Sequence, residues 1–241
     1  MSTPASALSI LCAVSTAERR VHRLEPSGYS CELRGTIASA GFSSGHRFVV
    51  GHWEESPLGP MDDVMWARPD GVRVLLVDRR EVAELITAVY RFETVEVVPL
   101  RWRMDGAVLA VTAGDVRVTL RAGRRWPIPL PRLRSRPALL PLERLLARCV
   151  LGVRTWGVSP TGVQEWYRAD EYRRVVAGGA SLGDRDLGRL RRFHEPARFG
   201  FSEPPRRPSL VRVRPLLHDP SGRLGAVVSR GGRSAGREGR E

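Results

Sequence analysis

The chain has 241 residues, of which 42% are hydrophobic and 27% charged, a composition typical of a soluble globular protein with one core. Its formal net charge is +13, and all 39 basic residues are arginine because the sequence contains no lysine. A guanidinium stays protonated at any working pH and cannot form an imine, so covalent catalysis by a side-chain amine is excluded. The three cysteines show no Cys-x-x-Cys spacing, which argues against a zinc site or a disulfide framework.

Both ends of the chain lack the periodicity of packed elements. We interpret residues 1–40 as a poorly ordered extension, or as sequence upstream of the true start. Its apolar run, Leu8–Val14, is too short for a membrane span, and no positive charge precedes it as a secretory signal requires. Gly, Ser and Arg dominate residues 218–241, which we expect to form a disordered tail. One cytoplasmic domain over residues 41–217 is therefore predicted.

The domain begins with a strand whose two faces both carry polar side chains. Period-2 alternation along residues 46–54 places His52 and Glu54 on one face and Arg47 and Trp53 on the other. A strand with functional groups on both faces is a good candidate for lining a site.

A stiff turn follows at residues 56–61. Its two prolines fix φ, and the glycine between them can take positive φ. Asp62 and Asp63 come directly after the turn, and a hairpin over residues 64–77 follows, with Pro-Asp-Gly at its tip. Two carboxylates are thus predicted at the mouth of a strand pair.

The remaining elements predict a mainly β (α+β) fold, an antiparallel barrel-like single domain with two short helices. The helices are expected at residues 79–90 and 138–151, where apolar side chains recur at helical spacing. Tight-turn sequences separate strands in the middle of the chain, and prolines mark extended segments. We expect strands at 94–103, 107–113, 116–121 and 210–217, extended segments at 123–137 and 199–209, and a loop at 178–190.

One short pattern occurs twice. Trp-x-x-Ser-Pro-x-Gly appears at residues 53–59 and again at 156–162, and each copy leads to an acidic residue six positions after its serine. Chance can produce such a pair. If the repeat is real, a pseudo-symmetric barrel would bring together Asp62 or Asp63 with Glu165, Trp166 and Tyr167.

The turn also carries a resemblance to a known family. Residues 56–63, Ser-Pro-Leu-Gly-Pro-Met-Asp-Asp, followed by a hairpin, a short helix and another strand, are similar to the Gly-x-Tyr-x-Glu region of the acetoacetate decarboxylase-like superfamily. The resemblance is distant and covers roughly residues 48–123. In that family the final acidic residue of the turn lines the active-site cavity of a β-barrel. The resemblance implies this role for Asp63.

The chain departs from the family at its Schiff-base lysine. The decarboxylases carry this lysine in a Tyr-Pro-Lys-Lys sequence, and the corresponding place here reads Val-Tyr-Arg-Phe-Glu over residues 89–93. The resemblance therefore implies the fold of the family but not its decarboxylase chemistry.

The sequence yields a set of candidate site residues. A buried carboxylate can act as a general acid or base, and arginine can anchor an anionic ligand through two parallel hydrogen bonds. For the acidic residues the alternative is a solvated rim, and for the tryptophans it is core packing. The acid/base candidates are Asp63, Glu165 and Glu54, and the ligand-binding candidates are Arg47, His52, Trp53, Asp62, Arg91, Arg101 and Trp166.

Other kinds of site are less well supported. His46 and His52 are separated by roughly 20 Å of strand, too far to share a metal ion, and no Gly-x-Ser-x-Gly elbow of a hydrolase is present. Nine arginines fall within residues 117–148, but arginine in place of every lysine is also what GC-rich coding produces. We expect no metal, no cofactor, no specific nucleic acid and no membrane contact.

Three hypotheses for function remain. The first is an acetoacetate decarboxylase-like protein that binds, and in one version transforms, a small organic acid or oxo compound in a barrel pocket without Schiff-base chemistry. The second is a ligand-binding barrel without catalysis, and the third is an interaction module that uses the arginine patch. Whether the protein is an enzyme, and whether it forms a homo-oligomer, stays open at this point.

Overall fold

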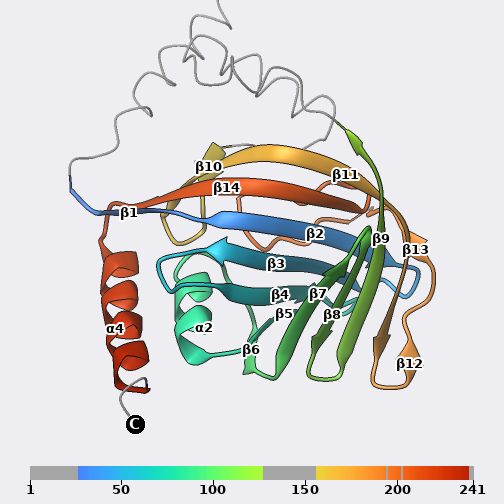
Figure 1. Ribbon diagram of the computed structural model, residues 1–241, viewed down its shortest axis with the longest axis horizontal. Coiled ribbons are helices and arrows are strands. Elements are labelled where there is room, and N and C mark those ends of the chain that lie inside the picture. Colours follow the sequence, from blue (N-terminus) through green and yellow to red (C-terminus); the bar gives the residue numbers. More distant parts are fainter. Residues whose placement is uncertain (1–26, 127–155, 194, 202, 239–241) are drawn as a thin grey trace, which may run out of the picture.

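The computed structural model describes residues 27–126, 156–193, 195–201 and 203–238. They form a mainly β single domain built on one strongly curled sheet (Figure 1). The strands follow one path of hydrogen-bonded neighbours: β6 (Thr94–Val97), β5 (Arg73–Val77), β4 (Met61–Ala67), β3 (Arg47–Glu55), β2 (Arg34–Phe42), β14 (Ser209–Asp219), β11 (Gln164–Leu182), β9 (Val116–Trp126), β8 (Val108–Ala113) and β7 (Leu100–Asp105).

Short strands and two helices complete the described part of the chain. The short strands pair beside the main path: β1 (Tyr29–Glu32) on β14, β10 (Trp156–Val158) and β12 (Arg185–Asp186) on β11, and β13 (Leu190–Arg191) on β2. The helices are α2 (Arg80–Thr87) and α4 (Arg223–Glu238), which lie side by side (Figure 1). Within the described residues, neither helix is long and apolar enough to cross a membrane.

The sheet is a mixed half-barrel rather than the antiparallel barrel predicted. Strand β6 runs parallel to β5, because α2 connects them and returns the chain to the end of the sheet where β5 began. The path ends at β6 on one side and at β7 on the other, and in the described residues these two edges do not pair. The expected single strand over 94–103 is broken at Pro99, so its two halves lie at opposite edges of the sheet.

The local signals for turns are confirmed. The Pro-Asp-Gly tip joins β4 to β5 with Gly71 at φ 88°, and the chain turns between β7, β8 and β9 at Gly106 and Gly114, both also at positive φ. Helix α2 forms where helical spacing predicted it, and it buries Val82, Leu85 and their neighbours.

The structure differs from the prediction at both ends of the domain. Residues 29–40, expected to be poorly ordered, form β1 and most of β2, and residues 223–238 of the expected tail form α4. The expected loop at 178–190 is the end of β11 with β12 and β13. The predicted helix at 138–151 and most of the arginine patch lie outside the described residues.

Both faces of the sheet are buried over much of its area. Where the sheet curls over, one core cluster joins Phe48, Val50 and Trp66 to β8 and β9. On the other face, a second cluster joins Trp53, Met65 and Leu75 to α2, α4 and the segment around Phe199. Strands β3 and β4 therefore contribute side chains to two separate interiors.

Candidate functional site

The neighbouring residues Asp62 and Asp63 lie on opposite faces of β4. Asp62 is paired in register with His52, and Asp63 with Gly51. Because side chains alternate along a strand, Asp63 joins the helix-covered core while Asp62 faces the curl of the sheet. The two carboxylates predicted at one mouth therefore belong to different environments.

Asp63 is buried against its neighbours on β3. Its side chain is 1% exposed, and its Oδ1 accepts a hydrogen bond of 2.8 Å from Trp53 Nε1. A Cβ atom at Gly51 would lie 2.3 Å from Oδ1, so the carboxyl group occupies space that only glycine leaves free. Burial, together with the nearby charge of Asp62, raises the pKa of Asp63 to about 7 despite the Trp53 hydrogen bond.

Glu165 is the second buried carboxyl group of this face. It is fully buried on β11, and its Oε2 accepts a hydrogen bond of 2.5 Å from the Tyr90 hydroxyl. Its Oε1 is buried and has no hydrogen-bond partner. Burial raises the pKa of Glu165 to about 7, although hydrogen bonds from Tyr90 and Tyr167 act in the opposite direction.

Two tyrosines share this face with the buried carboxyl groups, and we call Asp63, Tyr90, Glu165 and Tyr167 the acid–tyrosine cluster. The hydroxyl oxygens of Tyr90 and Tyr167 are 2.6 Å apart. Burial, followed by the charge of Glu165, raises the pKa of both phenols well above 10, and Asp63 adds to this effect on Tyr167. The cluster therefore holds several exchangeable protons in a region shielded from water.

The sequence positions the cluster through the two Ser-Pro-x-Gly turns. In each turn the serine carbonyl accepts the glycine N–H at 3.0 Å, and Gly59 and Gly162 both have positive φ. Each turn leads directly into the strand that carries a buried acid. The repeat predicted that Glu165 would correspond to Asp62, but it is Asp63 that shares the face of the cluster. Asp63 and Glu165 lie on the same helix-covered face of the sheet, and the association of the two turns stays a prediction.

The segment 195–201 covers the tyrosines. Gly200 packs against the ring of Tyr90, where an added Cβ would come within 2.5 Å, and the Phe201 and Tyr167 ring centroids lie 6.1 Å apart. The Glu203 carboxylate accepts the backbone N–H groups of Ala197 and Arg198. These contacts fix an aromatic cover over one side of the acid–tyrosine cluster.

The opposite face of β3 and β4 carries a histidine–aspartate pair. His52 Nδ1 and Asp62 Oδ1 are 2.6 Å apart, and the His52 ring stacks on Trp102 of β7 with centroids 4.7 Å apart and planes 3° apart. Both side chains of the pair are about one quarter exposed. The stacking holds the edge strand β7 against β3, where the curled sheet folds back on itself. We therefore assign the His52–Asp62 pair a structural role.

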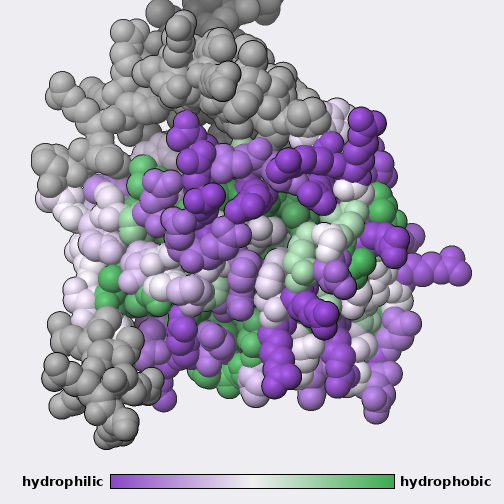
Figure 2. Space-filling view, viewed as in Figure 1, coloured by the Kyte–Doolittle hydropathy of each residue, from purple (hydrophilic) through white to green (hydrophobic). Residues whose placement is uncertain are grey.

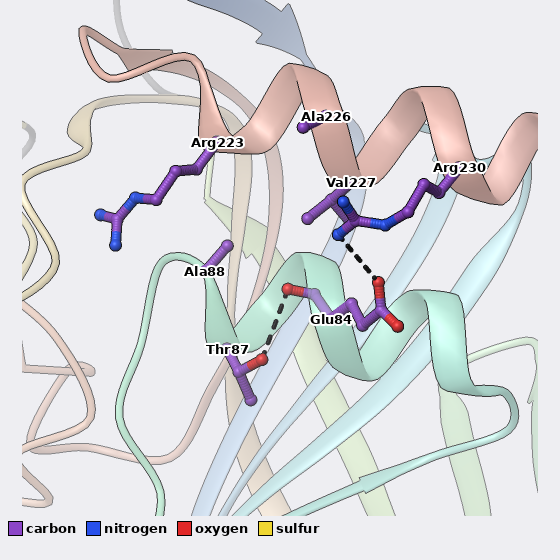
Figure 3. Close-up of a pocket in the computed structure, with 7 residues that line it drawn as sticks. All are labelled: Glu84, Thr87, Ala88, Arg223, Ala226, Val227 and Arg230. Atoms are coloured by element: carbon purple, nitrogen blue, oxygen red, sulfur yellow. Dashed lines mark hydrogen bonds and ion pairs between the residues drawn. The ribbon is translucent and has the colours of Figure 1, made fainter.

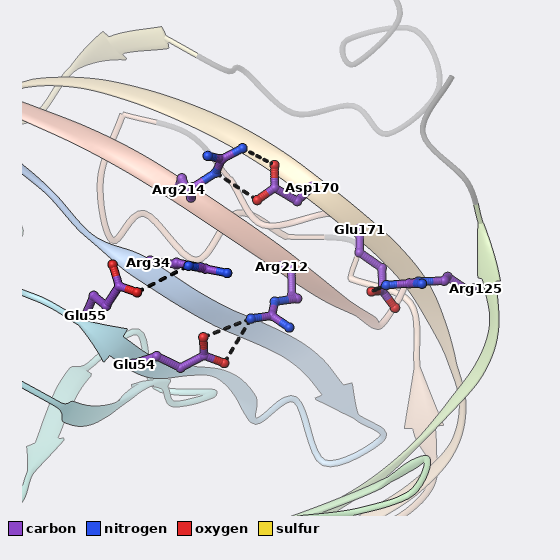
Figure 4. A network of polar contacts seen from close by, with 8 residues as sticks. All are labelled: Arg34, Glu54, Glu55, Arg125, Asp170, Glu171, Arg212 and Arg214. Atoms are coloured by element: carbon purple, nitrogen blue, oxygen red, sulfur yellow. Dashed lines mark hydrogen bonds and ion pairs between the residues drawn. The ribbon is translucent and has the colours of Figure 1, made fainter. Parts of the chain in front are cut away.

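Glu54, an acid/base candidate, is not near Asp63. Its carboxylate accepts hydrogen bonds from Arg212 Nη2, the shorter at 2.8 Å, at the rim of the sheet. Arg214–Asp170 and Arg34–Glu55 form similar pairs in the same region (Figure 4). Glu171 is buried there between Arg125 and Arg173. Each charge in this network has a partner, so the rim resembles a solvated salt-bridge surface more than a binding site.

The remaining ligand-binding candidates are dispersed. Arg47 is buried, stacks on Phe193 with its guanidinium carbon 3.7 Å from the ring centroid, and leaves Nε and Nη1 unpaired. Arg91 is exposed and donates to the carbonyl of Pro160. Arg101 is exposed on β7, and Trp166 lies opposite Trp156 in the register of β10 and β11. Among the predicted residues, the structure pairs Trp53 with Asp63 and His52 with Asp62, and it places Glu165 on the same helix-covered face as Asp63.

Sequence reasoning missed Tyr90 and Gly51, and it named Tyr167 only as a neighbour of Glu165 in the second copy of the repeat. Alternation from Glu165 places Tyr167 on the same face, a signal that was visible in the sequence. Tyr90 follows α2 and lies outside the strands, so strand alternation does not place it. Its contact with Glu165 spans 75 positions in the chain, and no local pattern predicts a contact of that range.

A shallow cleft of about 400 Å³ lies between α2 and α4 (Figure 3). Thr87 and Val227 line it, and Arg230 bridges it to Glu84 at 3.4 Å. It contains none of the predicted site residues. Among the described residues, no three His, Cys, Asp or Glu side chains are placed to hold a metal ion.

Comparison with protein family models, with curated proteins and with solved structures found no match to this chain.

Proposed function

We propose that this protein binds and transforms a small oxo compound at the acid–tyrosine cluster, in a half-barrel of the acetoacetate decarboxylase-like type that works without a Schiff base. The observation that carries the proposal is the pair of fully buried carboxyl groups, Asp63 and Glu165, on one face of the sheet with two tyrosine hydroxyls beside them. Buried titratable groups with strongly perturbed pKa values cluster at functional sites.

The chemistry of the cluster suits a carbonyl group. The pKa values of Asp63 and Glu165 are both raised to about 7 by burial, so near neutral pH each is present in both its acid and its base form. A neutral carboxyl group donates a hydrogen bond to a carbonyl oxygen, and an ionised one accepts a proton. General acid–base catalysis is most efficient when the catalytic pKa lies near the working pH.

The charge of the cluster narrows the ligand class. None of the hydrogen bonds at Asp63 or Glu165 comes from an arginine in the described residues. A ligand carboxylate placed here would add a negative charge beside two acids in a region of low dielectric. A neutral oxo compound is therefore favoured over an organic acid.

The resemblance of the turn supports the family assignment. Asp63 is the position that matches the acidic residue of the family motif, and it points into a buried interior at the end of a stiff Ser-Pro-Leu-Gly-Pro turn. Tyr90 and not a lysine reaches this interior from the residues that correspond to the family's Tyr-Pro-Lys-Lys. Tyrosine offers a hydroxyl for hydrogen bonding but no amine for an imine.

A thermal-shift screen tests the proposal. Ketones, aldehydes and keto acids are added to wild type, Asp63→Asn, Glu165→Gln and the control Glu171→Gln, whose buried carboxylate lies on the same strand but away from the cluster. At a ligand concentration of about 100 Kd we expect Tm to rise by roughly 5–10 °C in wild type and the control. The rise should be absent from the two cluster variants. A panel in which no neutral oxo compound stabilises wild type would contradict the proposal.

A further inference from the structure

We propose that Glu165 is the base that removes a proton from the carbon next to the carbonyl group of a neutral oxo compound, so that the reaction at the cluster is an enolisation. This inference rests on the proposed function and adds a reaction class and a role for each oxygen. It requires no metal, no oxidant and no second substrate.

The two oxygens of Glu165 have different surroundings. Oε2 is held by the Tyr90 hydroxyl, which in turn lies 2.6 Å from the Tyr167 hydroxyl. Oε1 is buried and unpartnered. An unpaired buried acceptor costs free energy unless something in the functional state occupies it. A C–H group of a ligand, which needs a base but no strong hydrogen bond, is a chemically suitable occupant.

The tyrosine pair positions Glu165 and does not replace it as the base. With Tyr90 donating to Oε2, the carboxylate is held in one orientation, and Oε1 is left without a hydrogen-bond partner. Such orientation matters because proton transfer from carbon demands that donor and acceptor be held at the correct geometry. Tyr90 is therefore a positioning residue.

Asp63 is the acid that completes the reaction. Trp53 occupies Oδ1, which leaves Oδ2 to carry the proton when the carboxyl group is neutral. Asp63 and Glu165 both lie on the helix-covered face of the sheet, where their neighbours Trp53 and Tyr167 belong to one core cluster. A neutral carboxyl group that donates to a developing enolate oxygen stabilises it in a site shielded from water.

Glu165, Asp63 and the ligand account for every proton and electron pair that moves in this reaction. Glu165 Oε1 takes the proton from the α-carbon, and the electron pair of that C–H bond forms the carbon–carbon double bond of the enol. The carbonyl oxygen takes the proton of Asp63, which becomes a carboxylate. Reversal returns a proton from Glu165 to carbon and one from the enol oxygen to Asp63, and the net result is isomerisation or isotopic exchange.

Deuterium exchange measures this reaction without knowledge of the natural substrate. Acetone, cyclohexanone and 2-butanone are incubated with the full chain in D₂O, and loss of the α-proton signals is followed by NMR. Wild type and Glu171→Gln should exchange the α-protons of at least one probe faster than buffer alone. Glu165→Gln should reduce the enzyme-dependent rate by about 100-fold or more, the scale of general-base catalysis.

The pH profile separates the roles of the two acids. Exchange requires ionised Glu165 and neutral Asp63, so the rate should pass through a maximum near neutral pH. In Asp63→Asn the descending limb on the alkaline side should disappear. Tyr90→Phe should lower the maximal rate and shift the ascending limb, an effect that a merely structural hydroxyl would not produce.

The outcomes are distinguishable from failure of the proposed function. A probe that stabilises wild type but shows no exchange would overturn the enolisation and leave ligand binding intact, whereas absence of both would overturn both. Exchange that persists in Glu165→Gln would also overturn the assignment. If that variant does not fold, Glu165→Asp, which retracts the carboxylate by one methylene, should show the same loss in its place.

Discussion

Gly51 is the residue on which the geometry around Asp63 depends. A methyl group there would come within 2.3 Å of Asp63 Oδ1 and 2.7 Å of Trp53 Nε1, both of which are held by their mutual hydrogen bond. Neither atom is the free end of a flexible chain. The glycine is therefore required by cross-strand contact and not by backbone conformation, since Gly51 is not at positive φ.

Gly51→Ala should destabilise the protein by about 1–3 kcal/mol, the usual cost of overpacking a core. Urea denaturation gives the measurement. Gly179→Ala on β11 is the matched control, since a Cβ there meets nothing within 4 Å, and it should be close to neutral. In an Asp63→Ala background the cost of Gly51→Ala should shrink, because the atom that clashes has been removed. Simple additivity would contradict this account.

The buried acids also predict how stability depends on pH. The pKa of Asp63 rises from 3.8 to about 7 on folding, and that of Glu165 from 4.5 to about 7. Between the unfolded and the folded pKa of each group, the folded state keeps a proton that the unfolded state has lost. Each group therefore stabilises the fold at low pH, and this contribution is lost as the pH rises through the folded pKa of about 7. The slope is up to about 1.4 kcal/mol per pH unit for each group.

The free energy of unfolding of Asp63→Asn or Glu165→Gln should therefore decrease less between pH 5 and pH 8 than that of wild type. Glu171→Gln provides the opposite case, because its arginine partners outweigh burial and lower the pKa of Glu171. Its contribution is lost as pH falls through the acidic range, so over pH 5–8 this variant should follow wild type. Identical pH slopes in wild type and the two cluster variants would refute the assignment of raised pKa values.

At the scale of elements, α4 shows how a helix can form where composition predicts disorder. Asp219, at the end of β14, is 1% exposed and accepts the backbone N–H of Leu224 at 2.9 Å and of Ser221 at 2.9 Å. Leu224 and Val227 then bury their side chains in the helix-covered core. Packing and this cap together outweigh the poor helix propensity of the glycines and serines.

Asp219→Ala should destabilise the start of α4, by about 0.5–2 kcal/mol, because Leu224 loses the acceptor for its N–H group. Amide hydrogen exchange should show reduced protection over residues 223–231. Asp184→Ala, an exposed aspartate in the turn between β11 and β12, is the control and should leave the exchange of α4 unchanged. Equal protection of α4 in both variants would show that the cap is dispensable.

The elements that the sequence predicts well are those with local causes. The hairpins at Gly71, Gly106 and Gly114, helix α2 and the two Ser-Pro-x-Gly turns all follow from residues within a few positions of one another. Strand β2 was missed because its small residues have no sustained period. They are small because neighbours need the space: a Cβ at Gly35 would lie 2.1 Å from the His52 carbonyl oxygen, and Gly41 faces the Phe193 ring.

The candidate site was predictable only in its acidic half. Turn chemistry and the repeat drew attention to Asp63 and Glu165, while alternation on the strand assigned Trp53 to the correct face. Tyr90, by contrast, is brought to Glu165 by the packing of α2 against the curled sheet. The arginines proposed as anchors are dispersed: Arg47 stacks on Phe193, Arg91 donates to the Pro160 carbonyl and Arg101 is exposed on β7.

At the scale of the whole molecule, the net charge of +13 acts on charged partners at longer range than any other property of the surface. Hydrophilic side chains gather over β2, β14 and β11 on the face shown in Figure 2. Many arginines there are paired with acids, which limits the free positive charge of this surface.

We predict weak association with nucleic acids that does not depend on base sequence. Fluorescence anisotropy with two unrelated DNA duplexes should give equal affinities, and these should fall by about tenfold or more between 50 and 200 mM salt, as expected for phosphate contacts alone. A nanomolar complex that is insensitive to salt, or one that distinguishes the two duplexes, would contradict the prediction.

The strand pair β3–β4 serves two interiors, and this constrains how the lineage of this protein can alter the turn that joins its strands. Gain or loss of a single residue there would shift β4 by one position and exchange the surroundings of Asp62 and Asp63. A carboxylate that now pairs with His52 would enter the helix-covered core, and the acid of the cluster would leave it. We therefore expect this turn to accept the gain or loss of two residues more readily than of one. A one-residue change would alter both interiors at once, because every side chain of β4 would move to the opposite face.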